Sequence, residues 1–237
     1  MHIESTCPAS AVTGNAKVTD ADRAATIPCW KRAFDLSCVL LSLPCWLPFM
    51  IAVALWVKAV SPGPVFFRQE RVGYRGRRFL ILKFRTMKVN TETATHELHL
   101  QQLIRSNGPM TKLDAGDPRI IRGGRVLRAL GLDELPQLFN VLVGDMSLVG
   151  PRPCTPHEFR SYQPSQRARV QAPPGLTGYW QVNGKNKTTF TEMIELDLFY
   201  ARMMSPRLDA LILVKTIPAV LEQFLEFFSF RSRRGLR

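Results

Sequence analysis

Two adjacent acids and a proline-flanked arginine are the residues of this chain best suited to phosphate chemistry. Asp133 and Glu134 lie between leucines, and Arg152 lies between two prolines. Neighbouring side chains on a helix point about 100° apart, so the two acids would have different tasks, one facing a substrate phosphorus and the other holding a cation. The pair alone also suits the start of a helix, where acids complement the macrodipole.

Arg152 favours the catalytic interpretation. Because the flanking prolines fix the backbone dihedral angles, its guanidinium extends from a stiff segment, which suits bidentate phosphate recognition. Arg128, five residues before Asp133, could reach the same site. Mg²⁺ commonly binds one or two carboxylates together with substrate phosphates. Asp133, Glu134 and Arg152 are therefore consistent with a nucleophile, a magnesium ligand and a phosphate clamp.

Four arginines precede the acids at every third position: Arg119, Arg122, Arg125 and Arg128. This spacing would place several guanidiniums on one side of a helical turn. A solvated basic face is the alternative interpretation. Because the series leads directly into Asp133, we favour an anion-binding wall.

The composition is that of a folded, strongly basic protein. Its 237 residues are 46% hydrophobic and 22% charged, which excludes a disordered chain or a coiled coil. Five cysteines without a CxxC pair do not form a disulfide framework, so we expect reduced thiols and a cytoplasmic location for the folded part. A formal charge of +13 calls for nucleic acid, lipid headgroups or a phosphorylated substrate as partner. We disfavour nucleic acid because the aromatic residues form no recognisable stacking platform.

Residues 36–57 form an uncharged apolar run that is long enough to cross a bilayer as one helix. Pro44 and Pro48 lie at its middle and predict a kink. Basic residues flank the run on both sides: Lys31, Arg32, Lys58 and five arginines between 68 and 78. Because basic residues favour the cytoplasmic side, both ends should lie there, and we predict a re-entrant helix that enters one leaflet. The alternatives are a kinked transmembrane helix and a buried helix of a soluble protein.

The remaining segments predict a small, helix-rich domain. Aromatic and β-branched runs separated by a glycine-containing turn predict a β-hairpin over 65–84, and residues 91–105 predict a polar helix. The Gly- and Pro-rich residues 173–184 predict a binding loop, and residues 190–203 predict a helix. The apolar segment 209–230, which leads into arginines, predicts an amphipathic helix at a membrane surface, with a helix packed on the core as the alternative.

These features predict an α+β, helix-rich monotopic membrane protein with a re-entrant, proline-broken helix, a small β-hairpin and interfacial amphipathic helices. We assign residues 1–28 to a flexible N-terminal tail and 29–60 to the re-entrant membrane helix. Residues 61–221 would form a cytoplasmic catalytic domain, and residues 222–237 a basic C-terminal tail.

Six motifs, in order along residues 30–220, closely resemble those of bacterial sugar transferases in the polyprenyl-phosphate phosphoglycosyl transferase superfamily. They are KRAFD (31–35), SPGPVFFRQERVG (61–73), KFRTM (83–87), LDELPQLFNVLVGDMSLVGPRP (132–153), PGLTGYWQVNGKN (174–186) and ELDLFY (195–200). The resemblance implies a monotopic protein whose broken helix enters the cytoplasmic leaflet. It also implies transfer of a sugar 1-phosphate from a UDP-sugar to undecaprenyl phosphate, with release of UMP.

The resemblance implies catalytic roles for four residues. In the family's Asp-Glu pair the Asp is the nucleophile, which forms a covalent phospho-sugar intermediate, and the Glu serves Mg²⁺. These roles fall on Asp133 and Glu134. Arg128 and Arg152 match arginines that would contact substrate phosphate.

Further positions match less directly. Lys83 and Arg85 match a basic strand and would be additional phosphate-binding residues, and Asp197 matches an acid near the active site. Pro48 matches the helix-breaking proline of the family. Pro44 is an addition, and Leu47 stands where the family often has serine.

The implied partners are a UDP-sugar, undecaprenyl phosphate, Mg²⁺ and one leaflet of the bacterial inner (plasma) membrane at its cytoplasmic face, without nucleic acid. The sugar is not readable, although KTIPAVL (215–221) is more similar to exopolysaccharide-initiating members and hints at galactose or glucose. A homodimer is left open. The alternative function is a non-catalytic basic scaffold of a polysaccharide assembly complex.

Overall fold

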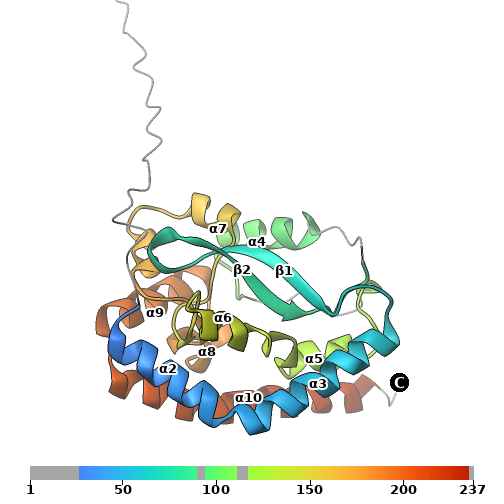
Figure 1. Cartoon of the computed structure of the whole chain (residues 1–237). Helices are drawn as coiled ribbons and strands as arrows, with labels where there is room; N and C mark the ends of the chain where they lie inside the picture. The colour runs from blue at the N-terminus through green and yellow to red at the C-terminus, as the bar shows by residue number, and fades with distance from the viewer. Residues whose placement is uncertain (1–26, 90–93, 111–116, 235–237) are drawn as a thin grey trace, which may run out of the picture.

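The computed structural model describes residues 27–89, 94–110 and 117–234. Most of the tail expected over 1–28 therefore lies outside the described residues. Within them, helices surround two small sheets, as Figure 1 shows. The expectation of a helix-rich α+β fold with a small hairpin is confirmed.

The apolar run forms two helices that meet in a shallow V along one edge of the molecule (Figure 1). Helix α2 spans Cys29–Leu41 and helix α3 spans Leu43–Val60, with the boundary at Ser42. Pro44 lies in the first turn of α3, where its missing N–H leaves no helical bond unmade. Pro48 lies inside α3. The observed break thus lies in the turn before Pro44, where a proline disturbs a helix, whereas α3 continues through Pro48, the other proline expected to break it.

Basic residues hold the start of α2 against the rest of the protein. Lys31 is fully buried, donates to the Tyr200 hydroxyl at 2.9 Å and forms an ion pair with Asp209. Arg32 donates to two carbonyls at the end of α6 (Gln137–Val143), where a cation complements the helix dipole. These two residues, which the sequence showed only as basic residues flanking the apolar run, thus also bind protein groups.

The other end of the V is fastened to the same body. The guanidinium of Arg85 donates to the carbonyls of Ser61 and Pro62, both at 2.8 Å, directly after α3. Between the two ends, α3 faces the core with side chains spaced three to four residues apart: Trp46, Met50, Val53 and Val57. The V therefore lies along the protein over its whole length.

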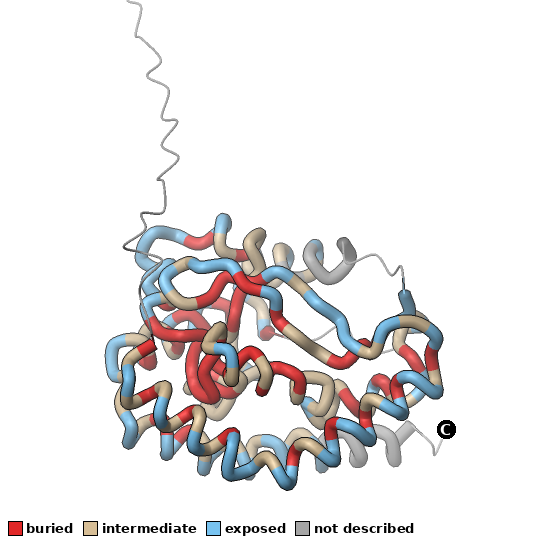
Figure 2. The backbone as a smooth tube through the Cα atoms, in the orientation of Figure 1, coloured by how far each residue is buried: buried red, intermediate tan, exposed pale blue. Residues whose placement is uncertain are grey.

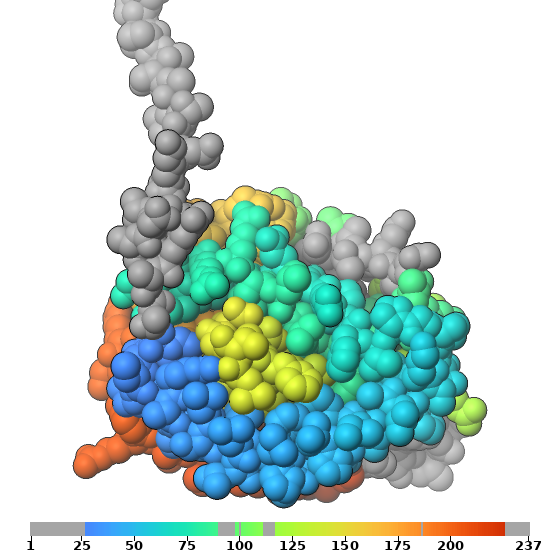
Figure 3. All heavy atoms as spheres, viewed as in Figure 1, coloured from blue at the N-terminus to red at the C-terminus, as the bar shows by residue number. Residues whose placement is uncertain are grey.

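The predicted hairpin is present and is joined to helix α6. Strands β1 (Phe66–Val72) and β2 (Arg78–Phe84) pair antiparallel, with the 3₁₀ turn η1 (Tyr74–Gly76) between them. The Asn140 side chain of α6 donates to the Leu80 carbonyl at 2.8 Å and accepts from the Leu82 N–H at 3.0 Å. This connection places β2 over the segment that carries the two acids. Figure 3 shows α6, in yellow, between the hairpin and α2.

A second, parallel sheet takes one of its two strands from the segment 173–184 that the sequence predicted as a binding loop. Strand β3 (Ser147–Val149) pairs with β4 (Gly175–Thr177), and helix α8 (Tyr179–Val182) follows. The prediction of an irregular loop over 173–184 is wrong, because strands of three residues are too short to show a periodic pattern. A Cβ atom at Gly175 would lie 2.0 Å from the backbone nitrogen of Gly150, so the close pairing requires glycine.

Five further helices complete the fold: α4 (Ala94–Ser106), α5 (Gly124–Ala129), α7 (Pro156–Ser161), α9 (Phe190–Met203) and α10 (Pro206–Arg234). Helix α9 has the predicted bounds. Helix α10 continues across the boundary assigned at 221. Figure 2 colours the backbone of buried residues red. The main core gathers buried side chains from α2, β2, α6, β3, α9 and α10: Val39, Phe84, Val141, Val149, Tyr200 and Ile212.

Candidate active site

The two acids lie on a short 3₁₀ helix between α5 and α6. This helix, η2 (Leu132–Glu134), follows Gly131, whose φ of 69° is the left-handed conformation that favours glycine. Helix α6 begins only at Gln137, so the acids precede it and are not its first turn. Asp133 and Glu134 both line a cavity of about 1130 Å³.

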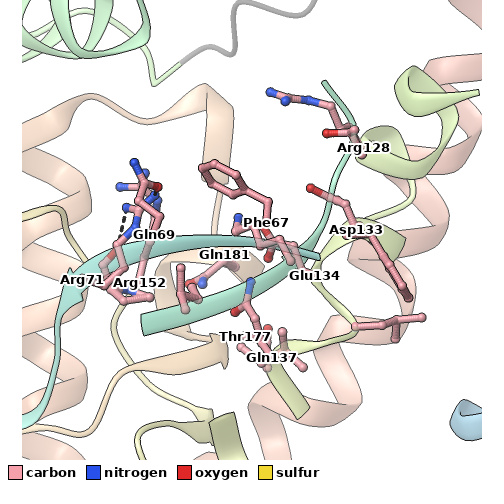
Figure 4. Close-up of a pocket in the computed structure, with 18 of the residues that line it drawn as sticks. Phe67, Gln69, Arg71, Arg128, Asp133, Glu134, Gln137, Arg152, Thr177 and Gln181 are labelled. Carbon is pink, nitrogen blue, oxygen red and sulfur yellow. Dashed lines mark hydrogen bonds and ion pairs between the residues drawn. The ribbon is translucent and has the colours of Figure 1, made fainter. Parts of the chain in front are cut away.

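This cavity brings together most of the predicted site residues (Figure 4). Those that line it are Lys83, Arg85, Arg128, Asp133, Glu134 and Arg152. In Figure 4 the Asp133 side chain points toward Arg128, and Arg152 lies across the cavity from both. Asp197 does not line it.

Lys83 and Glu134 form an ion pair at the cavity wall. The Lys83 Nζ atom lies 2.8 Å from Glu134 Oε1, and both side chains are partly exposed. The pair orients the Glu134 carboxylate and adds a positive charge beside it. Lys83, expected to bind phosphate, thus also positions the second acid.

Arg85 has a different role from the one predicted. Although it lines the cavity, its guanidinium is buried and donates to Ser61 and Pro62 behind α3. Arg85 thus holds the end of α3 from the cavity wall, and its phosphate-binding role stays a prediction. The sequence could not show the structural role because Pro62 and Ser61 lie 23 and 24 residues away.

A buried carboxylate joins two arginines at the opposite wall. Glu158 Oε1 lies 3.0 Å from Arg152 Nη1, and Glu158 Oε2 lies 3.7 Å from Arg71 Nη1. Glu158 also forms a capping box with Thr155 at the start of α7. Burial raises the pKa of Glu158, whereas the charges of Arg152 and Arg71 lower it. The lowering is the larger effect, so the pKa lies below its usual value. Two guanidiniums against one carboxylate leave an excess positive charge at this wall.

Arg71 is a candidate phosphate-binding residue that the sequence interpretation missed. It lines the cavity from β1 and donates to the Pro153 carbonyl at 3.1 Å, next to Arg152. Figure 4 shows the two arginine side chains together. In the sequence Arg71 is one of several arginines of the hairpin. Only its position at the buried end of β1 distinguishes it.

Asp197 lies behind the cavity wall, where it pairs with Arg169. It is fully buried and forms an ion pair with Arg169, which donates to the Arg152 carbonyl at 2.9 Å and to the Tyr162 hydroxyl at 2.7 Å. Burial raises the pKa of Asp197 to about 6, against the lowering effect of Arg169. Asp197 therefore lies next to the cavity and not in its lining, and it supports the backbone of Arg152 through Arg169.

Replacing Arg169 by methionine should lower the free energy of unfolding by about 3 to 5 kcal/mol, because the Asp197 carboxylate would stay buried without its partner. The double variant Arg169→Met, Asp197→Leu should recover much of this loss, since it removes both charges. Urea unfolding of detergent-held protein, followed by tryptophan fluorescence, measures both effects. A single variant as stable as the double variant would show that the pair does not support this region.

The predicted wall of four arginines is not formed. Arg119 forms an ion pair with Asp117, and Arg122 and Arg125 are exposed, whereas Arg128 lines the cavity. Helix α5 begins only at Gly124, so the helical spacing rule does not hold for the first two arginines.

The donor set at η2 suits Mg²⁺. The described residues contain no group of three or more His, Cys, Asp or Glu side chains that could hold a metal ion. Mg²⁺ does not require one, because it keeps several waters and binds through one or two carboxylates together with substrate phosphates. Asp133 and Glu134, adjacent and both facing the cavity, fit that requirement.

Paired acids and arginines around one cavity are typical of enzymes that act on phosphates, and the long apolar helix α3 is consistent with membrane association. Residues 26–223 match the family model described as bacterial sugar transferase, and the chain belongs to this family. The resemblance stated from the motifs is confirmed.

Several characterised relatives align over most of the chain. The exopolysaccharide production protein ExoY of Sinorhizobium fredii is 38% identical over 196 residues, which cover 80% of this chain and 84% of that protein. The UDP-glucose:undecaprenyl-phosphate glucose-1-phosphate transferase of Caulobacter vibrioides is 41% identical over 200 residues, covering 81% and 69%. The undecaprenyl-phosphate galactose phosphotransferase of Salmonella typhimurium is 38% identical over 81% of this chain, but the match covers 40% of that longer protein.

Proposed function

We propose that this protein transfers a sugar 1-phosphate from a UDP-sugar to undecaprenyl phosphate, releasing UMP, as the first step in assembling an exopolysaccharide-type glycan. The observation that carries the proposal is the Asp133–Glu134 pair in a cavity with arginines on both sides, in a chain of the bacterial sugar transferase family. The names of the Salmonella and Caulobacter relatives support this donor and acceptor.

The reaction would take two displacements at one phosphorus. A carboxylate oxygen of Asp133 attacks the phosphorus that bears the sugar, and the bond from that phosphorus to the bridging oxygen breaks, so UMP leaves with the bonding electrons. An oxygen of undecaprenyl phosphate then attacks the same phosphorus and displaces the Asp133 carboxylate. The covalent intermediate divides one difficult step into two, and the anionic donor and anionic lipid need not be bound together.

The charges around the cavity would make this attack feasible. A carboxylate approaching a diphosphate is repelled, and Arg128, Arg152 and Arg71 would offset that repulsion in a partly dry cavity. Glu134, oriented by Lys83, would hold Mg²⁺, which leaves Asp133 to attack the phosphorus. The bound ion would neutralise phosphate charge and help the leaving group depart.

An exposed apolar layer would hold the protein in one leaflet at the cytoplasmic face. Among the described residues, α3 is the one helix long and apolar enough to cross a membrane. Exposed apolar side chains continue from the V onto α10: Leu40, Leu41, Phe49, Ile51, Leu55, Trp56, Leu211, Val214, Ile217 and Leu221. Because both ends of the V are bound to one body, a re-entrant position explains this layer better than a crossing. The cavity would then lie at headgroup level, where the lipid phosphate is.

The test uses purified protein in nanodiscs with undecaprenyl phosphate, Mg²⁺ and a panel of UDP-sugars. We expect UMP from one donor, and we expect EDTA to stop its release and added Mg²⁺ to restore it. Release of UDP would indicate ordinary glycosyl transfer and overturn the mechanism. No release with any donor would favour the alternative, a scaffold of a polysaccharide assembly complex.

The re-entrant position predicts that both ends of the V are labelled from the same side of the membrane. In a cysteine-free background, restored Cys29 and an introduced Lys58→Cys should both react with a membrane-impermeant maleimide in inside-out vesicles. Neither should react in right-side-out vesicles. Restored Cys45, next to the bend, should be protected in both preparations. Labelling of the two ends from opposite sides would establish a spanning helix.

A further inference from the structure

We propose that two glutamines and a threonine on the cavity floor, Gln137, Thr177 and Gln181, recognise the hydroxyl groups of the transferred sugar. The inference rests on the proposed function and assigns the donor specificity of that same cavity to these residues. They come from three elements, α6, β4 and α8, and lie near Glu134 in Figure 4.

The two amides are placed to bind a ligand. The Oε1 atom of Gln181 is buried and has no hydrogen-bond partner within the described part of the chain. The Gln137 residue is only 2% exposed, although it lines the cavity. The Gln181 Oε1 atom packs beside Gly178, where an added Cβ would lie 2.7 Å from it, so the rest of the Gln181 side chain lines the cavity. A ligand that enters the cavity with hydroxyl groups would bond to the parts of Gln137 and Gln181 that line it.

The floor suits a neutral polar ligand and not a phosphate. The hydroxyl groups of Thr177 and of Thr216 in α10 share a hydrogen bond of 2.8 Å. Gln137, Thr177 and Gln181 carry no charge. The arginines lie at the cavity walls, where an anion would be drawn. Amides and hydroxyls are the groups that fix and discriminate neutral hydroxyl-bearing ligands.

Proximity to the nucleophile favours the sugar over the uracil base. Gln137 follows Asp133 by four residues on the same local segment. In the proposed reaction the phosphorus attacked by Asp133 is bonded directly to the sugar, whereas a second phosphate and the ribose separate it from uracil. The neutral groups nearest Asp133 therefore face the sugar ring.

The test compares Gln181→Met and Gln137→Met, which keep the side-chain length but remove the amide, with Gln171→Met. Gln171 is exposed and does not line the cavity, so it is the matched control. The readouts are kcat/KM for UDP-galactose, UDP-glucose and UDP-N-acetylgalactosamine, and inhibition by UMP. In the Gln181 and Gln137 variants we expect kcat/KM for the preferred donor to fall at least about tenfold. The difference in kcat/KM between the donors should also become smaller. The inhibition constant of UMP should stay within about twofold, because UMP lacks the sugar.

Two results would overturn the proposal. Unchanged donor preference in both variants would show that the amides do not contact the sugar. UMP inhibition weakened in step with kcat/KM would assign the amides to the nucleotide. If the wild type releases no UMP, the proposed function fails, and equilibrium binding of each UDP-sugar and of UMP to the variants tests the subsite instead. A loss of affinity of about tenfold for the UDP-sugar, with UMP affinity unchanged, supports the subsite. Any other pattern excludes it.

Discussion

Replacing Asp133 by asparagine should reduce UMP release by at least about 10³-fold while the protein stays folded. The amide has the size of the carboxylate but is not a nucleophile toward phosphorus. Lys83 and Glu134 keep their ion pair, so the second acid stays in place. Initial rates of UMP release measure the loss. Mass spectrometry of protein incubated with the donor, without lipid acceptor, should show a phospho-sugar adduct on Asp133 in the wild type and none in the variant.

The matched control for this experiment is Asp145→Asn. Asp145 lies between α6 and β3 and does not line the cavity, so its rate should stay within about twofold of the wild type. Near-normal release by Asp133→Asn would remove the nucleophile from the mechanism. A lost rate together with an adduct on another residue would place the covalent step there instead.

The site residues that the sequence could indicate lie close together along the chain. Arg128, Asp133 and Glu134 lie within seven residues, and the turn that joins α5 to η2 brings them to one cavity wall. The hairpin and α9 were also predicted, because their patterns extend over seven or more residues. Short-range spacing was enough for these features.

The part that the sequence did not show depends on contacts between distant residues. The Lys31–Asp209 ion pair joins positions 178 residues apart, and the sequence showed Lys31 only as a basic residue flanking the apolar run. Arg85 and Asp197 were assigned to the active site from the family resemblance. The Arg85 guanidinium donates to Ser61, and the Asp197 carboxylate forms an ion pair with Arg169. No local sequence pattern indicates either contact.

The same long-range contacts explain how the site keeps its charge. Glu158, from α7, holds Arg152 of the Pro-Arg-Pro segment next to Arg71 of β1, and Arg169 fixes the Arg152 carbonyl from behind. The positive wall is therefore built from three separate chain segments, and its orientation does not depend on the stiff prolines alone. This arrangement predicts that geometry, and not charge alone, makes Arg152 effective.

Replacing Arg152 by lysine should accordingly lower kcat/KM about 100-fold, although the charge is retained. An ammonium group cannot form parallel bonds to Glu158 and to a phosphate as a guanidinium fork does. Arg160→Lys, on the exposed side of α7, is the control and should stay within about twofold. If the arginine acts mainly on the transition state, kcat should fall more than KM rises. A lysine variant with normal kcat/KM would show that positive charge at this wall is sufficient and that the Glu158 contact does not serve catalysis.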